Sequence, residues 1–241
     1  MALIWTWIFV VPLFALATIV CGAFSIAASL SKKRGRVMMG AAARVWGGML
    51  VKIAGVRITV EGLEKIDPNG AYVFASNHLS YMDTPVVLSQ IPVQFRFMAK
   101  SGLFKIPFLG THLAQAGHIP VPREDPRAAV RALALAGQTI RDHGISVLVF
   151  PEGGRAVDGK LQEFKEGAAY IAINAGVSVV PLALIGTREV LAMHTTIFHR
   201  GPVTLRVADP IPIEGLTMRD RKALTNKVRE QIAAMLDQFH G

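Results

Sequence analysis

AYVFASNHLSYMDTPVVLSQI, residues 71–91, decides the fold, because it combines a predicted strand, a bend and a predicted helix. Its first seven residues are mainly apolar and include aromatic and β-branched side chains, which is typical of a strand. Thr84 can cap a helix in which Pro85 takes the first helical position, so we predict that a short helix follows the bend. A strand that turns directly into a helix is a building unit of α/β folds.

The same alternation of strands and helices continues along the rest of the chain. Strands are predicted at 56–62, 95–100, 145–150, 177–186 and 202–211, and longer helices at 124–144, 166–176 and 217–239. Pro181 lacks an N–H donor, so we place its strand at a sheet edge or at a bulge. The pattern predicts one α/β domain in which helices flank a mixed central sheet.

Residues 1–30 carry no ionisable side chain, and the run exceeds the roughly 20 apolar residues that a membrane-spanning helix needs. A secretory signal peptide carries its positive charges before the apolar run, whereas the basic cluster SKKRGR, residues 31–36, follows it. The positive-inside rule places this cluster and the chain after it in the cytoplasm. The sequence leaves open whether residues 1–30 span the membrane or dip into one leaflet. The cluster consists of Lys32, Lys33, Arg34 and Arg36.

Residues 37–56 form a second apolar segment, which Arg44 and Lys52 interrupt. We interpret it as a helix lying against the membrane, with the two cationic side chains snorkelling and Trp46 at the interface. A helix packed on the globular part explains the segment equally well. We therefore divide the chain into membrane-anchoring helices at 1–56 and a globular domain at 57–241.

The balance of charge is basic, with a net charge of +9 and a pI near 10.1. Nucleic-acid modules usually show a basic stripe, often with stacking aromatic residues, whereas these cations are dispersed outside the cluster at 31–36. A basic cluster next to an apolar run is typical of an anchor on anionic membrane lipids. The composition therefore favours a membrane surface over nucleic acid. With Cys21 as the single cysteine, no intramolecular disulfide is possible, which fits a reducing compartment.

His78 and Asp83 form the first candidate site, at the bend of the opening stretch. A step of five residues separates two side chains on a regular helix or strand, so contact between them requires the bend. A carboxylate on one ring nitrogen fixes the tautomer and makes the other nitrogen a better base. Alternatively, His78 makes a hydrogen bond within a turn while Asp83 caps the helix.

FPEGGR, residues 150–155, directly follows a predicted buried strand, and ligands collect at the carboxyl ends of strands in α/β sheets. The adjacent glycines let a ligand approach backbone amides, and Arg155 can bind a phosphate. Arg123, at the end of GHIPVPR, and Lys100, at the end of strand 95–100, are further candidate cations. A glycine-rich surface turn with solvated cations is the alternative.

These stretches together resemble the glycerolipid acyltransferases, and most closely the 1-acyl-sn-glycerol-3-phosphate acyltransferases. The resemblance covers about residues 56–190 and rests on H-x-x-x-x-D, G-x-x-x-x-x-R, F-P-E-G-x-R and V-P-L-A-L in that order. Gly154 and Ala156 stand where the family usually has Thr and Ser. The resemblance implies that residues 57–241 form an acyltransferase domain.

The resemblance also implies a reaction. A fatty acyl group passes from an acyl thioester, either acyl-CoA or acyl-carrier protein, to the free hydroxyl of the lysophospholipid acceptor 1-acyl-glycerol 3-phosphate, which makes phosphatidic acid. His78 is the general base that Asp83 orients, and no cofactor or metal is required. Arg155, Lys100 and Arg123 hold the acceptor phosphate, while Glu152 and Gly153 shape the glycerol site.

The expected location of this reaction is the cytoplasmic face of the inner membrane. Other classes remain as alternatives: the same chemistry on glycerol 3-phosphate, another lysophospholipid or a lyso-ornithine lipid, a non-catalytic lipid-binding protein, and a lipid hydrolase. The chain contains no G-x-S-x-G motif of the kind that carries a hydrolase serine.

Overall fold

A computed structural model describes residues 1–31, 35–106, 109–122 and 124–237. Within these ranges the strands are β1 (Val56–Glu61), β2 (Val73–Ser76), β3 (Phe95–Lys100), β4 (Ile119–Val121), β5 (Ser146–Val149), β6 (Val179–Ile185) and β7 (Gly201–Val207). They form a seven-stranded sheet in the order β1-β7-β6-β2-β5-β3-β4. Neighbouring strands are parallel, apart from the antiparallel pair of β6 and β7. The predicted mixed sheet is confirmed.

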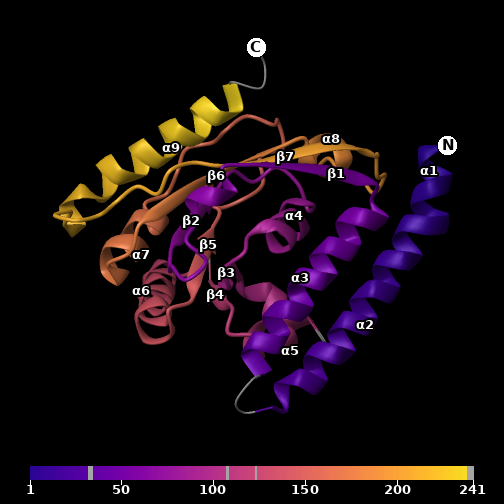
Figure 1. Ribbon diagram of the computed structural model, residues 1–241, viewed down its shortest axis with the longest axis horizontal. Helices are drawn as coiled ribbons and strands as arrows, with labels where there is room; N and C mark the ends of the chain where they lie inside the picture. Colours follow the sequence, from indigo (N-terminus) through magenta and orange to yellow (C-terminus); the bar gives the residue numbers. More distant parts are fainter. Residues whose placement is uncertain (32–34, 107–108, 123, 238–241) are drawn as a thin grey trace.

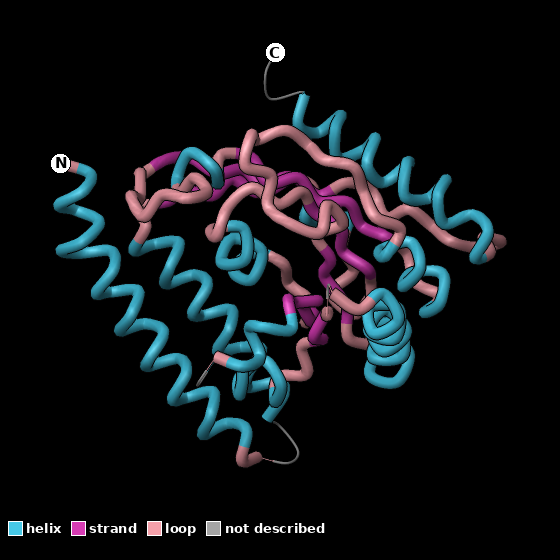
Figure 2. The backbone as a smooth tube through the Cα atoms, turned by 180° about the vertical axis from the view of Figure 1, so that it is seen from behind, coloured by secondary structure: helices cyan, strands magenta, loops and turns pink. Residues whose placement is uncertain are grey.

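The helices lie on both faces of this sheet (Figure 1). They are α1 (Ala2–Trp5), α2 (Val11–Ser29), α3 (Gly35–Ile53), α4 (Asp83–Gln90), α5 (Leu109–Gln115), α6 (Pro126–His143), α7 (Gly167–Ala175), α8 (Thr187–Val190) and α9 (Arg221–Asp237). A π-helical turn (Thr6–Val10) joins α1 to α2, and short 3-10 helices occupy Leu63–Lys65, Ser101–Lys105 and Met218–Asp220. Figure 2 shows the same arrangement from behind.

Two hydrophobic clusters hold the layers together, one on each face of the sheet. Strands β2, β5 and β6 contribute to both clusters, because their successive side chains point to opposite faces. Phe74, Leu148 and Leu182 belong to the cluster that includes residues of α3 and α4. Val73 and Val147 lie on the other face, in the cluster that includes residues of α6, α7 and α9. The central strands are buried on both faces, which explains why their sequences are almost continuously apolar.

Two local predictions are wrong. Helix α4 begins at Asp83, so Thr84 lies inside the first turn instead of capping it. Strand β6 is internal although it contains Pro181. The ladder between β6 and β7 starts at Leu182, so the missing N–H of Pro181 falls just outside it, while its carbonyl accepts a hydrogen bond from the Ala208 N–H at 3.0 Å. An internal strand tolerates proline at such a ladder end.

The N-terminal helix Ala2–Ser29 is fastened to the globular part near both of its ends. At one end, the Thr6 hydroxyl accepts a hydrogen bond of 3.0 Å from the Phe198 N–H. At the other, the Ser25 hydroxyl and Nδ1 of His112 lie 2.6 Å apart. The helix therefore lies along the domain and does not project away from it.

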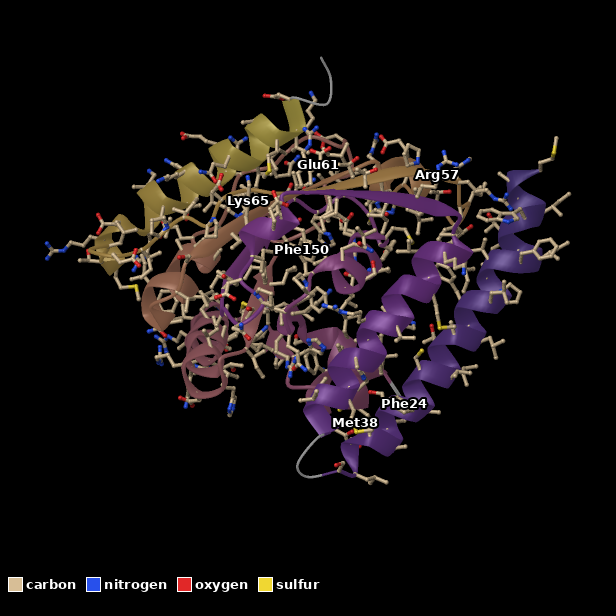
Figure 3. The ribbon with its side chains drawn as sticks, in the orientation of Figure 1. Phe24, Met38, Arg57, Glu61, Lys65 and Phe150 are labelled. Atoms are coloured by element: carbon tan, nitrogen blue, oxygen red, sulfur yellow. The ribbon has the colours of Figure 1, made fainter. Side chains whose placement is uncertain are left out.

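The opposite side of this helix exposes large apolar side chains. Among the described residues, it is the one helix long and apolar enough to cross a membrane, with 28 residues, and its length is about 40 Å. Its exposed apolar surface suits association with a lipid bilayer. The exposed side chains include Trp7, Ile8, Phe9 and the half-exposed Phe24, which Figure 3 labels. Of the basic cluster, Lys32, Lys33 and Arg34 lie outside the described residues, and only the backbone of Arg36 is described.

Helix α3 packs between α2 and α4. A Cβ added to Gly47 would lie 2.8 Å from the carbonyl oxygen of Pro85, so glycine permits the two helices to meet closely. Arg44 donates a hydrogen bond to the carbonyl oxygen of Ile91 and therefore points into the domain instead of snorkelling. The structure thus favours the second interpretation of residues 37–56, a helix packed on the globular part. The division of the chain at residue 56 stays a prediction.

His118 is a half-buried neutral imidazole that directly precedes β4. Its Nδ1 accepts a hydrogen bond of 2.9 Å from the Phe97 N–H, and protonation would place two donors against each other. Burial, the Arg96 guanidinium and His112 lower the pKa of His118 to about 3. In the unfolded chain the pKa of His118 is near 6.5. At a pH between about 3 and 6.5, the imidazole therefore binds a proton in the unfolded chain but not in the folded protein. Folding stability must therefore fall as the pH drops below 6.5.

We expect lowering the pH from 7.5 to 5.0 to cost about 2 kcal/mol of stability through His118 alone. His118→Asn keeps an acceptor for the Phe97 N–H but cannot titrate, so its melting temperature should change less over this range. Melting of the detergent-solubilised protein at both pH values measures the difference. His194→Asn, at an exposed position, is the control. An equal pH dependence of the wild type and His118→Asn would contradict the assignment.

Candidate active site

Asn77 directly follows strand β2 and sets the bend. Its side-chain amide donates to the carbonyl oxygen of Leu184 at 2.9 Å and accepts from the Leu184 N–H at 2.8 Å. The side chain thus imitates one more step of the pairing between β2 and β6, which ends at Ser76 and Leu182. The backbone of residue 77 is released from the sheet, and the chain can turn toward α4.

The bend brings His78 and Asp83 into contact. Nδ1 of His78 lies 2.8 Å from Oδ2 of Asp83, which is fully buried at the start of α4. The same oxygen accepts hydrogen bonds from the N–H groups of Leu79 at 2.7 Å and Ser80 at 2.8 Å. Asp83 therefore closes the turn and holds the imidazole at once. It does not cap α4, because the helix starts at Asp83 itself and its cap residue, Met82, makes no side-chain hydrogen bond, so the capping alternative is wrong.

The loop after β5 supports His78 from the other side. The ring of Phe150 stacks on the imidazole with centroids 3.8 Å apart and an interplanar angle of 12°, near the middle of the molecule (Figure 3). The His78 N–H donates to Oε1 of Glu152 at 2.7 Å, and the His78 carbonyl accepts from the Ala156 N–H at 2.9 Å. Because β2 and β5 are adjacent and parallel, their carboxyl ends place these two loops together.

Glu152 braces the two loops through backbone contacts. Its Oε1 accepts from the His78 N–H and its Oε2 accepts from the Gln162 N–H at 3.0 Å. Burial raises the pKa of the Glu152 carboxyl, while the hydrogen bonds from Gln162 and His78 act in the opposite direction. Gly153 has φ of +76°, which favours glycine. The predicted contact of Glu152 with the glycerol moiety stays a prediction.

The candidate phosphate ligands differ in how the structure holds them. Arg155 donates from Nε to the Ser80 carbonyl at 3.2 Å, and its guanidinium carbon lies 4.0 Å from the centre of the Tyr81 ring. Both contacts tie Arg155 to the loop that carries His78. Lys100 ends β3 with an exposed side chain. Arg123 lies outside the described residues.

A groove of about 1540 Å³ connects these groups, with His78, Lys100 and Arg155 in its wall. One end, which we call the apolar end, lies between α2, α3 and α5 and includes Ile19, Ile26, Ala42, Trp46 and Leu113. The other end, which we call the polar end, is lined by Lys165, Tyr170 and Arg221. His78 thus lies in a cavity that offers apolar surface for a hydrocarbon chain and cations for phosphate.

Sequence reasoning missed the polar end. Tyr170 lies on α7, Arg221 is the first residue of α9, and Lys165 lies just before α7. Only Lys165 carried a usable signal, because it belongs to the segment that leads from the F-P-E-G-x-R loop into the next predicted helix. The sequence gives Tyr170 and Arg221 no such link to His78.

The part of the chain that the structure describes contains no group of three or more His, Cys, Asp or Glu side chains that could hold a metal ion. The polar groups that line the groove include the imidazole of His78, which Asp83 holds, and several cations. Such an imidazole–carboxylate pair can accept a proton from a hydroxyl bound beside it.

Comparisons with known proteins agree with this geometry. The acyltransferase family model matches residues 57–185. The chain is 37% identical over 183 residues to the chloroplastic 1-acyl-sn-glycerol-3-phosphate acyltransferase LPAT1 of Arabidopsis thaliana, covering 75% of this chain and 49% of that protein. It is 32% identical over 185 residues to human 1-acyl-sn-glycerol-3-phosphate acyltransferase alpha, covering 77% and 65% respectively. The matched region thus spans about half to two thirds of these relatives.

A solved structure resembles the whole chain. The crystal structure of the 1-acyl-sn-glycerophosphate acyltransferase PlsC from Thermotoga maritima matches with a TM-score of 0.85 and 25% sequence identity, covering 100% of this chain and 98% of that one. The shared fold includes the N-terminal helices, which precede the segment that the family model matches. With its family segment, its relatives and its fold in agreement, the chain belongs to the acyltransferase family.

Proposed function

We propose that this protein transfers a fatty acyl group from an acyl thioester to the free hydroxyl of 1-acyl-glycerol 3-phosphate, which makes phosphatidic acid. The observation that carries the proposal is the contact between His78 and Asp83 in the wall of a groove with an apolar end and nearby cations. The names of the relatives, all glycerophosphate acyltransferases, support the choice of acceptor.

His78 acts as the general base. Because Nδ1 faces Asp83, the other ring nitrogen, Nε2, takes the proton of the acceptor hydroxyl as its oxygen attacks the thioester carbonyl carbon. The tetrahedral intermediate collapses with cleavage of the carbon–sulfur bond, and the imidazolium returns the proton to the leaving thiolate. The products are the new ester and a free thiol. The Asp83 carboxylate stabilises the imidazolium between the two proton transfers.

Arg155 and Lys100 are placed to neutralise the acceptor phosphate. Arg155 is held by the Ser80 carbonyl and the Tyr81 ring, so its guanidinium is already oriented on the loop that carries His78, and both residues line the same groove. An ordered guanidinium loses less conformational entropy on binding a phosphate than a mobile one. Arg123 stays a predicted third ligand. We place the reaction at the cytoplasmic face of the inner membrane, with the exposed side of α2 in the lipid.

We expect Arg155→Ala to raise the KM for lysophosphatidic acid roughly tenfold or more, because a charged hydrogen bond to phosphate is lost. The kcat should change less, since His78 and Asp83 are untouched. The KM of Arg155→Lys should lie between those of the wild type and Arg155→Ala, because lysine keeps the charge but loses the contact with the Ser80 carbonyl. Initial rates over a range of acceptor concentrations measure both constants. Arg57→Ala, exposed on β1, is the control (Figure 3). An unchanged acceptor KM in Arg155→Ala would contradict the phosphate role.

The proposed reaction is tested with purified protein, palmitoyl-CoA or palmitoyl-carrier protein as donor, and a panel of acceptors. Phosphatidic acid should form from lysophosphatidic acid with at least one donor. Higher turnover with glycerol 3-phosphate or a phosphate-free lysolipid would reassign the acceptor. Free fatty acid without acceptor would indicate a hydrolase, and an absence of thioester consumption would indicate a lipid-binding protein.

A further inference from the structure

The polar end of the groove presents hydrogen-bond donors that the protein itself does not use. Within the described ranges, Nζ of Lys165 and the hydroxyl of Tyr170 make no hydrogen bond or ion pair. Arg221 donates from Nε to Oε2 of Glu166 at 3.2 Å, and its Nη1 and Nη2 make no hydrogen bond with a described residue. Guanidinium, ammonium and hydroxyl donors converging on one cavity suit the oxygens of a phosphate.

Lys165 links this end to the reaction centre. A Cβ added to Gly153 would lie 2.8 Å from Nζ of Lys165, so the ammonium lies directly over the glycine. The Lys165 N–H also donates to the Pro151 carbonyl at 2.9 Å. The polar end therefore continues from the loop that supports His78 toward the first turn of α9.

The proposed reaction brings two anionic substrates to this groove. In lysophosphatidic acid the phosphate is separated from the reacting hydroxyl by only a few bonds of glycerol, so it must bind close to His78. Arg155, tied to Ser80, meets that requirement. In the donor, a long pantetheine arm separates the thioester from the phosphate groups, so these must bind further along the groove.

The orientation of the groove separates the two substrates as well. The apolar end is walled by α2 and α3, whereas α7 and α9 lie on the opposite side of the molecule (Figure 1). A lipid acceptor reaches the groove from the helices that expose apolar side chains. A water-soluble, phosphate-bearing donor reaches it from the other side.

We propose that Lys165, Tyr170 and Arg221 bind the phosphate groups of the acyl donor while its thioester lies at His78. The proposal rests on the proposed function, because it takes the donor to be a thioester of coenzyme A or of acyl-carrier protein. These donors share a 4′-phosphopantetheine phosphate, and coenzyme A adds its nucleotide phosphates.

Binding of S-hexadecyl-coenzyme A, a thioether that cannot react, tests the site without catalysis. Calorimetry on the detergent-solubilised full chain should show roughly tenfold weaker binding for Arg221→Ala and for Lys165→Ala. Glu166→Gln should bind more tightly than the wild type, because it removes the negative charge that Glu166 places against Arg221. Lys222→Ala is the matched control, since Lys222 is an exposed cation next to Arg221 that does not line the groove. Equal affinities for the wild type, Arg221→Ala and Lys165→Ala would overturn the proposal.

Kinetics then identify which substrate the site serves. Arg221→Ala should raise the KM for palmitoyl-CoA roughly tenfold, leave the KM for lysophosphatidic acid unchanged, and have no effect with palmitoyl-N-acetylcysteamine, which lacks phosphate. If Arg221→Ala raises the KM for palmitoyl-carrier protein as well, the site binds the 4′-phosphopantetheine phosphate that both donors share. If it raises the KM for palmitoyl-CoA alone, the site binds the nucleotide phosphates of coenzyme A. Both results support the proposal. A raised KM for lysophosphatidic acid instead would overturn it. Since thioether binding requires no turnover, a wild type that binds the analogue but does not acylate lysophosphatidic acid would refute only the proposed function.

Discussion

His78→Gln should lower the rate of acyl transfer by a factor on the order of 10²–10⁴, because it removes the proton acceptor from the reaction. The fold should survive, since the loop is held by backbone atoms of residue 78. Its N–H donates to Glu152 and its carbonyl accepts from Ala156, and a substitution of the side chain keeps both contacts. Phosphatidic acid formation from labelled donor measures the rate.

Two controls separate catalysis from folding in this variant. His78→Gln should melt within a few degrees of the wild type and should still bind S-hexadecyl-coenzyme A. His143→Gln, at the exposed end of α6, should transfer acyl groups at the wild-type rate. A His78→Gln protein that is folded and fully active would exclude His78 as the base.

Asp83→Asn should have the second largest effect, with a loss of activity also on the order of 10²–10⁴-fold. The asparagine carbonyl can still accept from the N–H groups of Leu79 and Ser80, so the turn is retained. That carbonyl takes the place of Oδ2 and therefore still faces Nδ1 of His78, but it carries no negative charge. The imidazolium that forms during the reaction then loses the carboxylate that stabilises it.

The matched control is Asp125→Asn. Asp125 caps α6 and accepts a hydrogen bond of 3.0 Å from the Ala128 N–H, and asparagine caps helices about as well as aspartate. Asp125→Asn should therefore retain both stability and activity. Comparable activity of Asp83→Asn and Asp125→Asn would show that the carboxylate of Asp83 does no more than close a turn.

The local part of the site could be predicted from sequence because its information is local. His78 and Asp83 lie in one strand–bend–helix unit, and the bend is visible in the residue pattern. The hydrogen bond from the His78 N–H to Glu152 spans 74 residues and depends on β2 and β5 being neighbours in the sheet. No periodicity in a single sequence specifies which strands are adjacent, so only the resemblance to a family suggested that these loops meet.

The sequence also could not predict which side of each N-terminal helix contacts the rest of the protein. Residues 1–30 are apolar on every side, so the sequence does not distinguish the side of α2 that lines the groove from the side that faces outward. Gly47 and Arg44 look like interruptions of an apolar helix, yet one permits the close contact with α4 and the other donates to the Ile91 carbonyl. Pro181 misled the prediction of an edge strand, because a missing N–H is harmless at the end of a ladder.

Helix α2 has one consequence for the path of the acceptor. It lines the apolar end of the groove and also exposes large apolar side chains outward. A lysolipid that had to desorb through water would expose its chain at about 0.8 kcal/mol per methylene, or about 12 kcal/mol for a palmitoyl tail. In the proposed reaction, part of the wall of the groove lies in the lipid, so the tail would slide from one hydrocarbon phase into another and bypass this desorption barrier.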